Sequence, residues 1–298
     1  MSKRNWALVA ATLVSIIYGV TFTIAKDVMP QYVAPFGFIA MRVGGSVVLF
    51  WMIAFLGPKE KIALNDFPRI IAAALFGVAI NMLTFFKGLS YTSPIMGAVL
   101  MVTTPMIVLI LSAIIMKERM QKRKILGIIL GLSGTMTLIL YGKSMINAPN
   151  ATLGNLLIFI NAVSYGFYLI IVKKLMDKYN AFTFVKWIYT FGFLMVLPFG
   201  WNEFQAIDWS TIPNPIVWKI GFVVVFSTFF TYLLNLLSMR ELNPTTIAVF
   251  IYLQPLFATI IAVGFGKDDL SLVKLLSAVL IFAGVFLVTQ KKKNDFTT

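Results

Sequence analysis

Apolar segments of about 20 residues fill almost the whole chain and leave no length for a water-soluble domain. The hydrocarbon core of a bilayer is about 30 Å thick, and a helix needs about 20 apolar residues to cross it. Hydrophobic residues make up 59% of the 298 residues and charged residues only 12%, against about 25% charged residues in an ordinary soluble domain. The sequence therefore predicts an all-α membrane protein that exposes apolar side chains to lipid.

Ten segments fit a transmembrane helix, and the connections between them are short. The predicted spans cover residues 6–25, 35–55, 70–86, 95–116, 125–141, 153–172, 181–198, 216–237, 245–265 and 275–289. The longest polar connection is predicted at 200–215. In lipid each span must satisfy its own backbone hydrogen bonds, so we expect every one of these segments to be helical.

Lysine and arginine residues are distributed unevenly between alternate connections. One set of connections, which includes both chain ends, holds 17 of these residues, and the opposite set holds 6. Cytoplasmic loops carry the excess of basic residues in membrane proteins. We therefore expect a multi-pass protein of the cytoplasmic membrane with both termini in the cytoplasm, which requires an even number of spans.

The two halves of the sequence repeat each other. Shifts of 147 and 150 residues superpose tyrosines, glycines and prolines: Tyr18 on Tyr165, Gly19 on Gly166, Pro105 on Pro255 and Gly134 on Gly284. We predict one five-helix repeat over residues 1–145 and a second over 151–292. Because five is odd, the second repeat must cross the membrane in the opposite direction. Inverted repeats of this kind are typical of secondary transporters, whose substrate sites lie near the midplane between the repeats.

Motifs in a fixed order also carry a resemblance to a known family. They are Tyr18-Gly19-Val20-Thr21-Phe22 before Lys26, Pro35 with Arg42, Ser93-Pro94, Thr104-Pro105 and Lys117-Glu118-Arg119, and in the second half Tyr165-Gly166, Asn243-Pro244 and Gln254-Pro255. In these motifs the chain resembles the EamA-type ten-helix carriers of the drug/metabolite transporter superfamily. The resemblance covers nearly the whole chain and implies a carrier for small metabolites, often one that exports amino acids. Tyr18 departs from the tryptophan that is common there, and Lys267-Asp268-Asp269 is a diverged copy of the Lys-Glu-Arg motif.

Polar side chains recur at helical spacing inside the predicted spans. Asn161, Tyr165 and Tyr168 follow i, i+4, i+7 spacing and so share one helix face. Polar groups facing lipid are costly, so these faces should point inward. The alternative is that they only bond neighbouring helices, at about 0.6 kcal/mol each. The predicted substrate-binding residues are Tyr18, Thr21, Arg42, Asn81, Thr104, Asn161, Tyr165, Tyr168, Thr231, Asn235 and Gln254.

Charged residues inside the spans are few and all basic. Arg42 lies about two turns inside its span and Lys186 between one and two turns inside its own, and all eleven acidic residues fall in loops or at span ends. A charge within the membrane is a functional hypothesis by default. Arg42 has a planar fork that suits a carboxylate, although anchoring at the interface is the alternative. Lys186 can instead extend to the cytoplasmic face. Because no acidic residue lies inside a predicted span, organic cations are disfavoured as substrates and no buried acid is available to carry a proton.

Prolines and glycines mark two further structural features. Pro105 and Pro255 lie mid-span, where a proline removes a backbone hydrogen bond and kinks a helix, so we predict a role in gating. A static kink is the alternative. Gly127, Gly131 and Gly134 follow the small-residue spacing that lets helices approach closely.

The chain contains no cysteine and no histidine, which removes the usual ligands of zinc and haem and the imidazole of acid–base catalysis. We therefore expect no cofactor, no metal and no enzymatic activity. The predicted function is a secondary transporter that moves a small metabolite by alternating access, with amino-acid export as the leading hypothesis. Another small neutral or anionic metabolite, or a membrane channel, is the alternative. The expected partners are a small-molecule substrate and the lipid bilayer, not nucleic acid, with the monomer as the functional unit.

Overall fold

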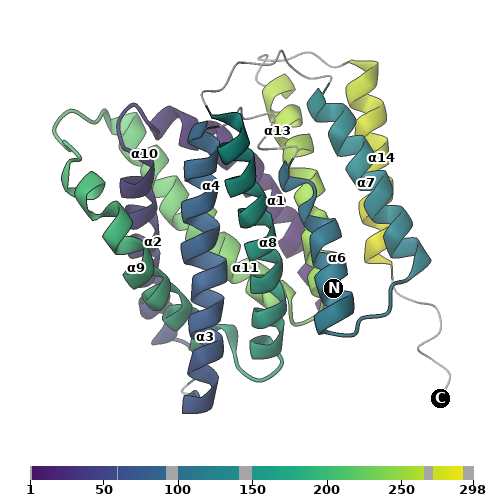
Figure 1. Cartoon of the computed structure of the whole chain (residues 1–298), viewed down its shortest axis with the longest axis horizontal. Helices are drawn as coiled ribbons and strands as arrows, with labels where there is room; N and C mark the ends of the chain where they lie inside the picture. The colour runs from purple at the N-terminus through teal and green to yellow at the C-terminus, as the bar shows by residue number, and fades with distance from the viewer. Residues whose placement is uncertain (1, 59, 92–99, 141–149, 265–270, 291–298) are drawn as a thin grey trace.

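The computed structural model describes residues 2–58, 60–91, 100–140, 150–264 and 271–290, and all regular structure in these ranges is helical (Figure 1). The first half contains α1 (Lys3–Val28), α2 (Pro35–Ala54), η1 (Leu64–Asp66), α3 (Phe67–Ala74), η2 (Leu75–Ala79), α4 (Ile80–Tyr91), α6 (Thr104–Ile115) and α7 (Lys122–Leu140). The second half contains α8 (Ala151–Met176), α9 (Ala181–Gln205), α10 (Asn214–Phe222), η3 (Val223–Phe230), α11 (Thr231–Ser238), α12 (Pro244–Val249), η4 (Phe250–Tyr252), α13 (Leu253–Gly264) and α14 (Leu272–Thr289). The Ser93-Pro94 and Lys267-Asp268-Asp269 motifs, the basic residues Lys59, Lys143 and Lys291–Lys293, Asp295, and the predicted span ends at 95–99, 141 and 265 lie outside the described residues.

Seven helical stretches in the described chain are long and apolar enough to cross a membrane. They are Lys3–Thr21, Pro35–Leu56, Leu64–Leu89, Thr152–Met176, Ala181–Gln205, Asn214–Ser238 and Pro244–Ile261. Shorter apolar helices occupy Thr104–Ile115 and Leu275–Thr289. These helices confirm the prediction of an all-helical, multi-pass membrane protein.

The helix α9 continues beyond residue 198, where the sequence predicted its end. Pro198 lies inside α9, which ends at Gln205, so the predicted polar connection shortens to residues 206–213. This extension is packed, because a Cβ added to Gly200 would lie only 2.4 Å from the carbonyl oxygen of Phe36. A membrane helix can accept a proline when neighbouring helices support the segment around it.

The helices α2 and α9 pack along each other and are joined at both ends by carboxylates. Glu203, near the end of α9, accepts the backbone N–H groups of Phe36 and Gly37 at the start of α2, at 2.6 and 2.9 Å. Glu60, which follows α2, accepts the N–H of Asn180 at the start of α9, at 2.9 Å. The first N–H groups of a helix have no partner within it, and a carboxylate there also complements the helix dipole. The first turn of α2 is therefore capped by a carboxylate from α9. In α9 the Asn180 side chain caps the helix by accepting the N–H of Phe182, and Glu60 holds Asn180 in place.

Glycines join α7 to α14 along the other flank of the bundle (Figure 1). A Cβ on Gly127 would lie 2.7 Å from the carbonyl oxygen of Gly284, and one on Gly134 would lie 2.8 Å from that of Ser277. No side chain fits at these positions without a shift of backbone. The prediction that the small-residue spacing serves close helix contact is confirmed.

Two continuous helical stretches, α3–η2–α4 and α10–η3–α11, each contain a π-helical segment. Backbone carbonyls in both segments accept bonds from side chains: the Tyr232 hydroxyl donates to the carbonyl of Gly77, and the Thr228 hydroxyl to that of Val223, both at 2.8 Å. Segments of this type are frequent at functional sites, because the wider turn re-aims side chains. Both segments adjoin residues of the cavity described below.

Pro105 begins a new helix, which corrects the prediction that it kinks a continuous one, whereas Pro255 lies in a stretch that is helical throughout. Pro105 is the second residue of α6 and follows a turn at residues 102–103. Pro255 is the third residue of α13 and follows the 3₁₀ segment η4. Proline is tolerated in the first turn of a helix, where its missing N–H has no helical partner anyway. The first stretch is therefore interrupted just before Pro105, whereas the second stays helical and only tightens to a 3₁₀ turn before Pro255.

The start of α1 and the end of α14 lie on the same side of the bundle, because the Arg4 guanidinium donates to the carbonyl of Thr289. The helices of the two halves also interleave. Besides the α2–α9 and α7–α14 pairs, α4 and α6 pack on α8, and α1 packs on α11 and α13. The core is therefore formed between the halves.

Candidate functional site

A cavity of about 420 Å³ lies between helices of both halves and reaches the connection between α1 and α2. Met29, Pro30 and Pro35 line it at that end. Its volume falls in the range of about 300–1,000 Å³ that is usual for ligand pockets. The polar residues among those lining it are Tyr18, Thr21, Arg42, Asn81, Asn161, Tyr165, Ser227, Tyr232 and Gln254. None of the described residues that line it is acidic.

Arg42 is the cation of this cavity and is nearly fully buried, with 6% of the residue exposed. Its Nε donates to the Thr228 hydroxyl at 3.0 Å, and its guanidinium lies 5.5 Å from the centre of the Phe86 ring. Thr228 can accept this bond because its own hydrogen goes to the carbonyl of Val223. Within the described chain no carboxylate pairs with Arg42. The site therefore holds a buried positive charge without a fixed counter-charge.

Hydrogen-bonding atoms without a protein partner accompany this charge. The Asn161 amide nitrogen donates to the backbone carbonyl of Asn81 at 2.7 Å, while its Oδ1 has no partner among the described residues. The hydroxyl of Ser227 is also buried without a partner there. Buried polar atoms are nearly always hydrogen-bonded. The cavity wall thus offers a cation and two open polar atoms to a ligand.

Tyrosine residues also contribute to the polar lining of the cavity. Tyr232 donates to the carbonyl of Gly77, so its hydroxyl is fixed, and its ring centre lies 6.0 Å from that of Tyr168. The ring of Tyr168 lies 6.0 Å from that of Tyr165, and Tyr18 also lines the cavity. The lining residues Tyr165 and Tyr232 are therefore fixed by packing against Tyr168, and Tyr232 also by its hydrogen bond to a backbone carbonyl.

Of the predicted binding residues, the structure brings seven to the cavity: Tyr18, Thr21, Arg42, Asn81, Asn161, Tyr165 and Gln254. The other four are buried and lie outside its lining: Thr104, Tyr168, Thr231 and Asn235. The ring of Tyr168 packs against the lining residues Tyr165 and Tyr232, and the Thr231 hydroxyl donates to the backbone carbonyl of the lining residue Ser227. Pro105 and Pro255 also lie outside the lining, although Gln254 precedes Pro255 directly.

Sequence reasoning missed Ser227 and Tyr232, which line the cavity from η3 and α11. It also placed Lys186 at the cytoplasmic interface, and the structure puts its Nζ 4.5 Å from the centre of the Trp51 ring, outside the cavity lining. The acidic residues lie where they were expected. Every described one falls in a connection or in the first or last turns of a helix.

A profile of the EamA-like transporter family matches this chain twice, at residues 5–140 and 152–290. The uncharacterized transporter YetK of Bacillus subtilis (strain 168) is 25% identical over 298 residues, covering 99% of this chain and 90% of that protein. An uncharacterized transporter of Archaeoglobus fulgidus is 25% identical over 291 residues, covering 97% of this chain and 100% of that protein. A solved crystal structure has a TM-score of 0.77 at 15% identity, with 96% of this chain and 97% of the other covered, and so shares the fold. These matches confirm the resemblance drawn from the motifs.

Proposed function

Because this chain belongs to the EamA-like transporter family, we propose that it transports a small metabolite with a carboxylate group. We propose further that this metabolite is an amino acid and that the protein exports it. Transport proceeds across the cytoplasmic membrane by alternating access and needs no buried acidic proton carrier. Arg42 is the observation that carries this proposal. A buried guanidinium without a carboxylate partner requires a counter-charge, and its planar fork binds a carboxylate through two parallel hydrogen bonds.

The cavity wall also supports a zwitterionic substrate. Asn161 offers an unpartnered buried carbonyl oxygen, which can accept a hydrogen bond from an ammonium group, and the ring faces of Tyr18 and Tyr165 can attract a cation. With no acidic residue in the described lining, a purely cationic substrate would find no compensating charge. The arrangement favours a ligand whose own carboxylate neutralises Arg42.

The proposal includes ten spans arranged as two inverted five-helix repeats, over residues 1–145 and 151–292. Corresponding structural features support it. The π-helical segments η2 and η3 lie in the third predicted span of each half. The departures from α-helical geometry before Pro105 and Pro255, a turn and a 3₁₀ segment, lie in the fourth. The helix contacts also correspond, since α4 packs on α8 as α11 packs on α1, and α6 packs on α8 as α13 packs on α1. Each half supplies one helix to the α2–α9 and α7–α14 pairs.

Both termini are proposed to be cytoplasmic, which makes the described cavity accessible towards the outside. The opposite end of the bundle is tied by two hydrogen bonds between the halves and one within the second half. The Thr245 hydroxyl donates to Glu118 at 3.2 Å, the Tyr179 hydroxyl to Asp66 at 2.6 Å, and Lys173 to the carbonyl of Met239 at 2.7 Å. Alternating access would break these ties as the outer end closes.

A cysteine at Asn202 should react with a membrane-impermeant thiol reagent from outside, and one at Lys122 should not. The chain has no native cysteine, so each variant reports a single position. Labelling in the reverse pattern would overturn the orientation. Labelling of both from outside would contradict an odd number of spans between Lys122 and Asn202, where the spans 125–141, 153–172 and 181–198 are predicted.

The substrate proposal is tested by uptake into proteoliposomes, comparing a panel of amino acids with the corresponding amides, with and without an imposed pH gradient. The native protein should transport acids and discriminate against amides. Arg42→Ala should weaken apparent substrate affinity about 10- to 100-fold, because hydrogen bonds to charged groups are worth about 1.5–3 kcal/mol. Arg42→Lys keeps the charge but loses the fork, so it should retain partial transport.

Lys186→Gln is the matched control, because it removes the other intramembrane cation, which lies on Trp51 outside the cavity. It should transport as the native protein does. Equal transport of acids and amides by the native protein would remove the carboxylate proposal. Strict dependence on the pH gradient would remove the proposal that transport is independent of a proton carrier.

A further inference from the structure

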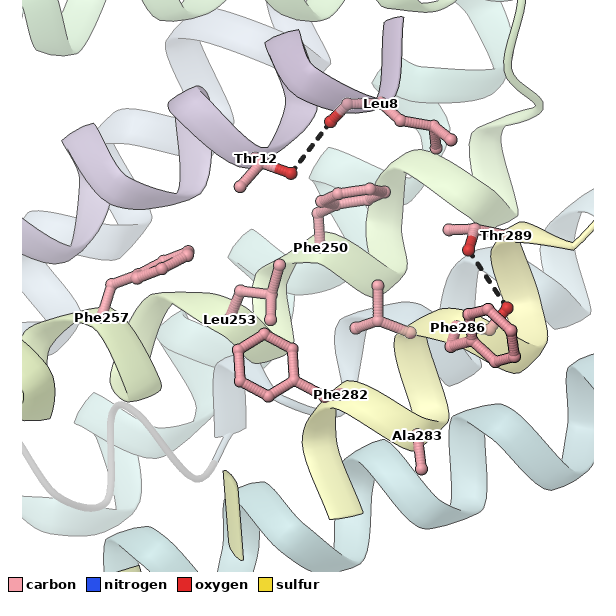
Figure 2. A pocket seen from close by; sticks show the side chains of 10 residues that line it. Leu8, Thr12, Phe250, Leu253, Phe257, Phe282, Ala283, Phe286 and Thr289 are labelled. Atoms are coloured by element: carbon pink, nitrogen blue, oxygen red, sulfur yellow. Dashed lines mark hydrogen bonds between the residues drawn. The ribbon is translucent and has the colours of Figure 1, made fainter. Parts of the chain in front are cut away.

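A second hollow, of about 540 Å³, lies between α1, α13 and α14, away from the central cavity. Figure 2 shows the rings of Phe250, Phe257, Phe282 and Phe286 around it. The described lining has two hydroxyl groups, and both are used within their own helices: Thr12 donates to the carbonyl of Leu8 at 2.9 Å and Thr289 to that of Phe286 at 3.1 Å. This groove therefore has no side-chain donor left to offer, and its occupant must be apolar along the groove.

The groove opens sideways into the membrane. Phe282 and Phe286 are 50% and 62% exposed on the apolar helix α14, so lipid has direct access to it. From Phe282 to Thr289 the helix rises about 10 Å at 1.5 Å per residue, while half of the hydrocarbon core measures about 15 Å. The groove thus extends over about two-thirds of one leaflet and ends where α14 ends.

Positive charge lies at that end. The Arg4 guanidinium donates to the carbonyl of Thr289, which is itself a lining residue, and Lys3 is exposed beside it in sequence. Beyond Gln290 the sequence continues with three lysines, followed by one acid at Asp295. Basic residues at the membrane surface attract anionic headgroups. An apolar groove within one leaflet, with cations at its surface end, matches a lipid that has an apolar chain and a negatively charged headgroup.

We propose that this groove binds an anionic phospholipid from the leaflet on the side where α1 begins. One acyl chain lies among the phenylalanine rings of α13 and α14, and the phosphate lies against Arg4 and Lys3. A free phosphate could bind the cations but has no acyl chain to fill the groove. A zwitterionic lipid could place a chain in the groove, but its headgroup is attracted less strongly to the cations. The proposal is independent of which metabolite the central cavity carries.

The groove and the central cavity share a wall. Phe250 and Leu253 face the groove, while Ile251 and Gln254, on the same turns, line the cavity. The shared wall is the stretch η4–α13, which changes from 3₁₀ to α-helical geometry. A bound acyl chain would therefore contact the groove-facing side of this segment, whose opposite side lines the central cavity.

The test titrates delipidated purified protein with dioleoyl phosphatidylglycerol or dioleoyl phosphatidylcholine, and counts retained lipid by native mass spectrometry alongside the melting temperature. The native protein should retain phosphatidylglycerol at least about tenfold more tightly than phosphatidylcholine. Lys3→Gln with Arg4→Gln should remove that preference, and Arg4→Lys should keep it, since it keeps the charge. Ala283→Phe, which fills the groove, should release both lipids.

Lys61→Gln with Lys174→Gln is the control, because it removes two exposed cations from the same predicted side of the membrane, and it should leave the preference intact. Equal retention of the two lipids by native protein would overturn the proposal, as would an unchanged preference in the Lys3 and Arg4 double variant. Undiminished retention in a monodisperse Ala283→Phe protein would overturn the placement in the groove. Competition by free glycerol phosphate as strong as that by the lipid would show that the cations alone form the site.

Discussion

Gly77→Ala should destabilise the protein, although it replaces a glycine within a continuous helical stretch. A Cβ at this position would lie 2.1 Å from Cδ2 and 2.6 Å from Cε2 of Tyr168. The ring would have to move by more than 1 Å to reach ordinary contact distance. It has no room to do so, because Tyr168 is 2% exposed and packs against the rings of Tyr165 and Tyr232.

The size of the effect follows from two opposing terms. Overpacking a core costs about 1–3 kcal/mol, and a displaced rigid ring places this site near the upper limit. Alanine is favoured over glycine in a helix by about 1 kcal/mol. The net loss is therefore about 2 kcal/mol. Gly221→Ala is the matched control, since nothing lies within 4 Å of its added Cβ, and it should instead gain about 1 kcal/mol.

Thermal unfolding of the detergent-purified variants measures the difference between the two substitutions. By the scaling of soluble chains, about 2–4 °C per kcal/mol, Gly77→Ala should melt about 4–8 °C below the native protein. In a Tyr168→Ala background the same substitution should cost nothing, because the colliding ring is gone. If Gly77→Ala raises the melting temperature as Gly221→Ala does, the steric reasoning is refuted.

Two further predictions concern the polar ends of the bundle. Asp66 accepts hydrogen bonds from Lys178 and Tyr179, which hold the pKa of its carboxyl below the ordinary 3.8; its stabilising contribution is complete above that pH and is lost as the pH falls through the lower folded-state value. The native melting temperature should therefore drop below about pH 4 more steeply than that of Asp66→Asn, and parallel curves would contradict this. Glu203→Ala removes the cap of α2 and should cost about 1 kcal/mol, whereas the exposed Glu241→Ala should change stability by less than about 0.5 kcal/mol; equal melting temperatures for these two variants would rule out the cap.

The apolar spans and the buried cation could be predicted from sequence, because length and charge in a membrane chain allow few alternatives. Inward-facing polar residues such as Tyr18, Asn81 and Asn161 were found for the same reason. On η3 and α11 the sequence predicted Thr231 and Asn235 as binding residues, whereas the residues that line the cavity there are Ser227 and Tyr232, five apart as in a π-helix. Periodicity cannot locate a face across a turn of different pitch.

Apolar members of the wall could not be predicted at all. Met82, Phe85 and Phe86 line the cavity, yet in a membrane protein apolar side chains face lipid, core and cavity alike. The capping of α2 by Glu203 and the hydrogen bond from Asn180 to Glu60 were also beyond prediction, since each joins residues more than 100 apart in sequence. The apolar lining and the bonds between helix ends both depend on tertiary packing, which a local sequence pattern does not predict.

The interleaving of the two halves has a consequence for synthesis on the ribosome. The helices α2, α4 and α7 find their extended packing partners in α9, α8 and α14, all of which are translated later. The first half must therefore enter the bilayer before the glycines of α7 and its inward polar faces are covered. They stay uncovered until the second half has been inserted. Completion of the bundle is therefore an association of two membrane-embedded halves of one chain.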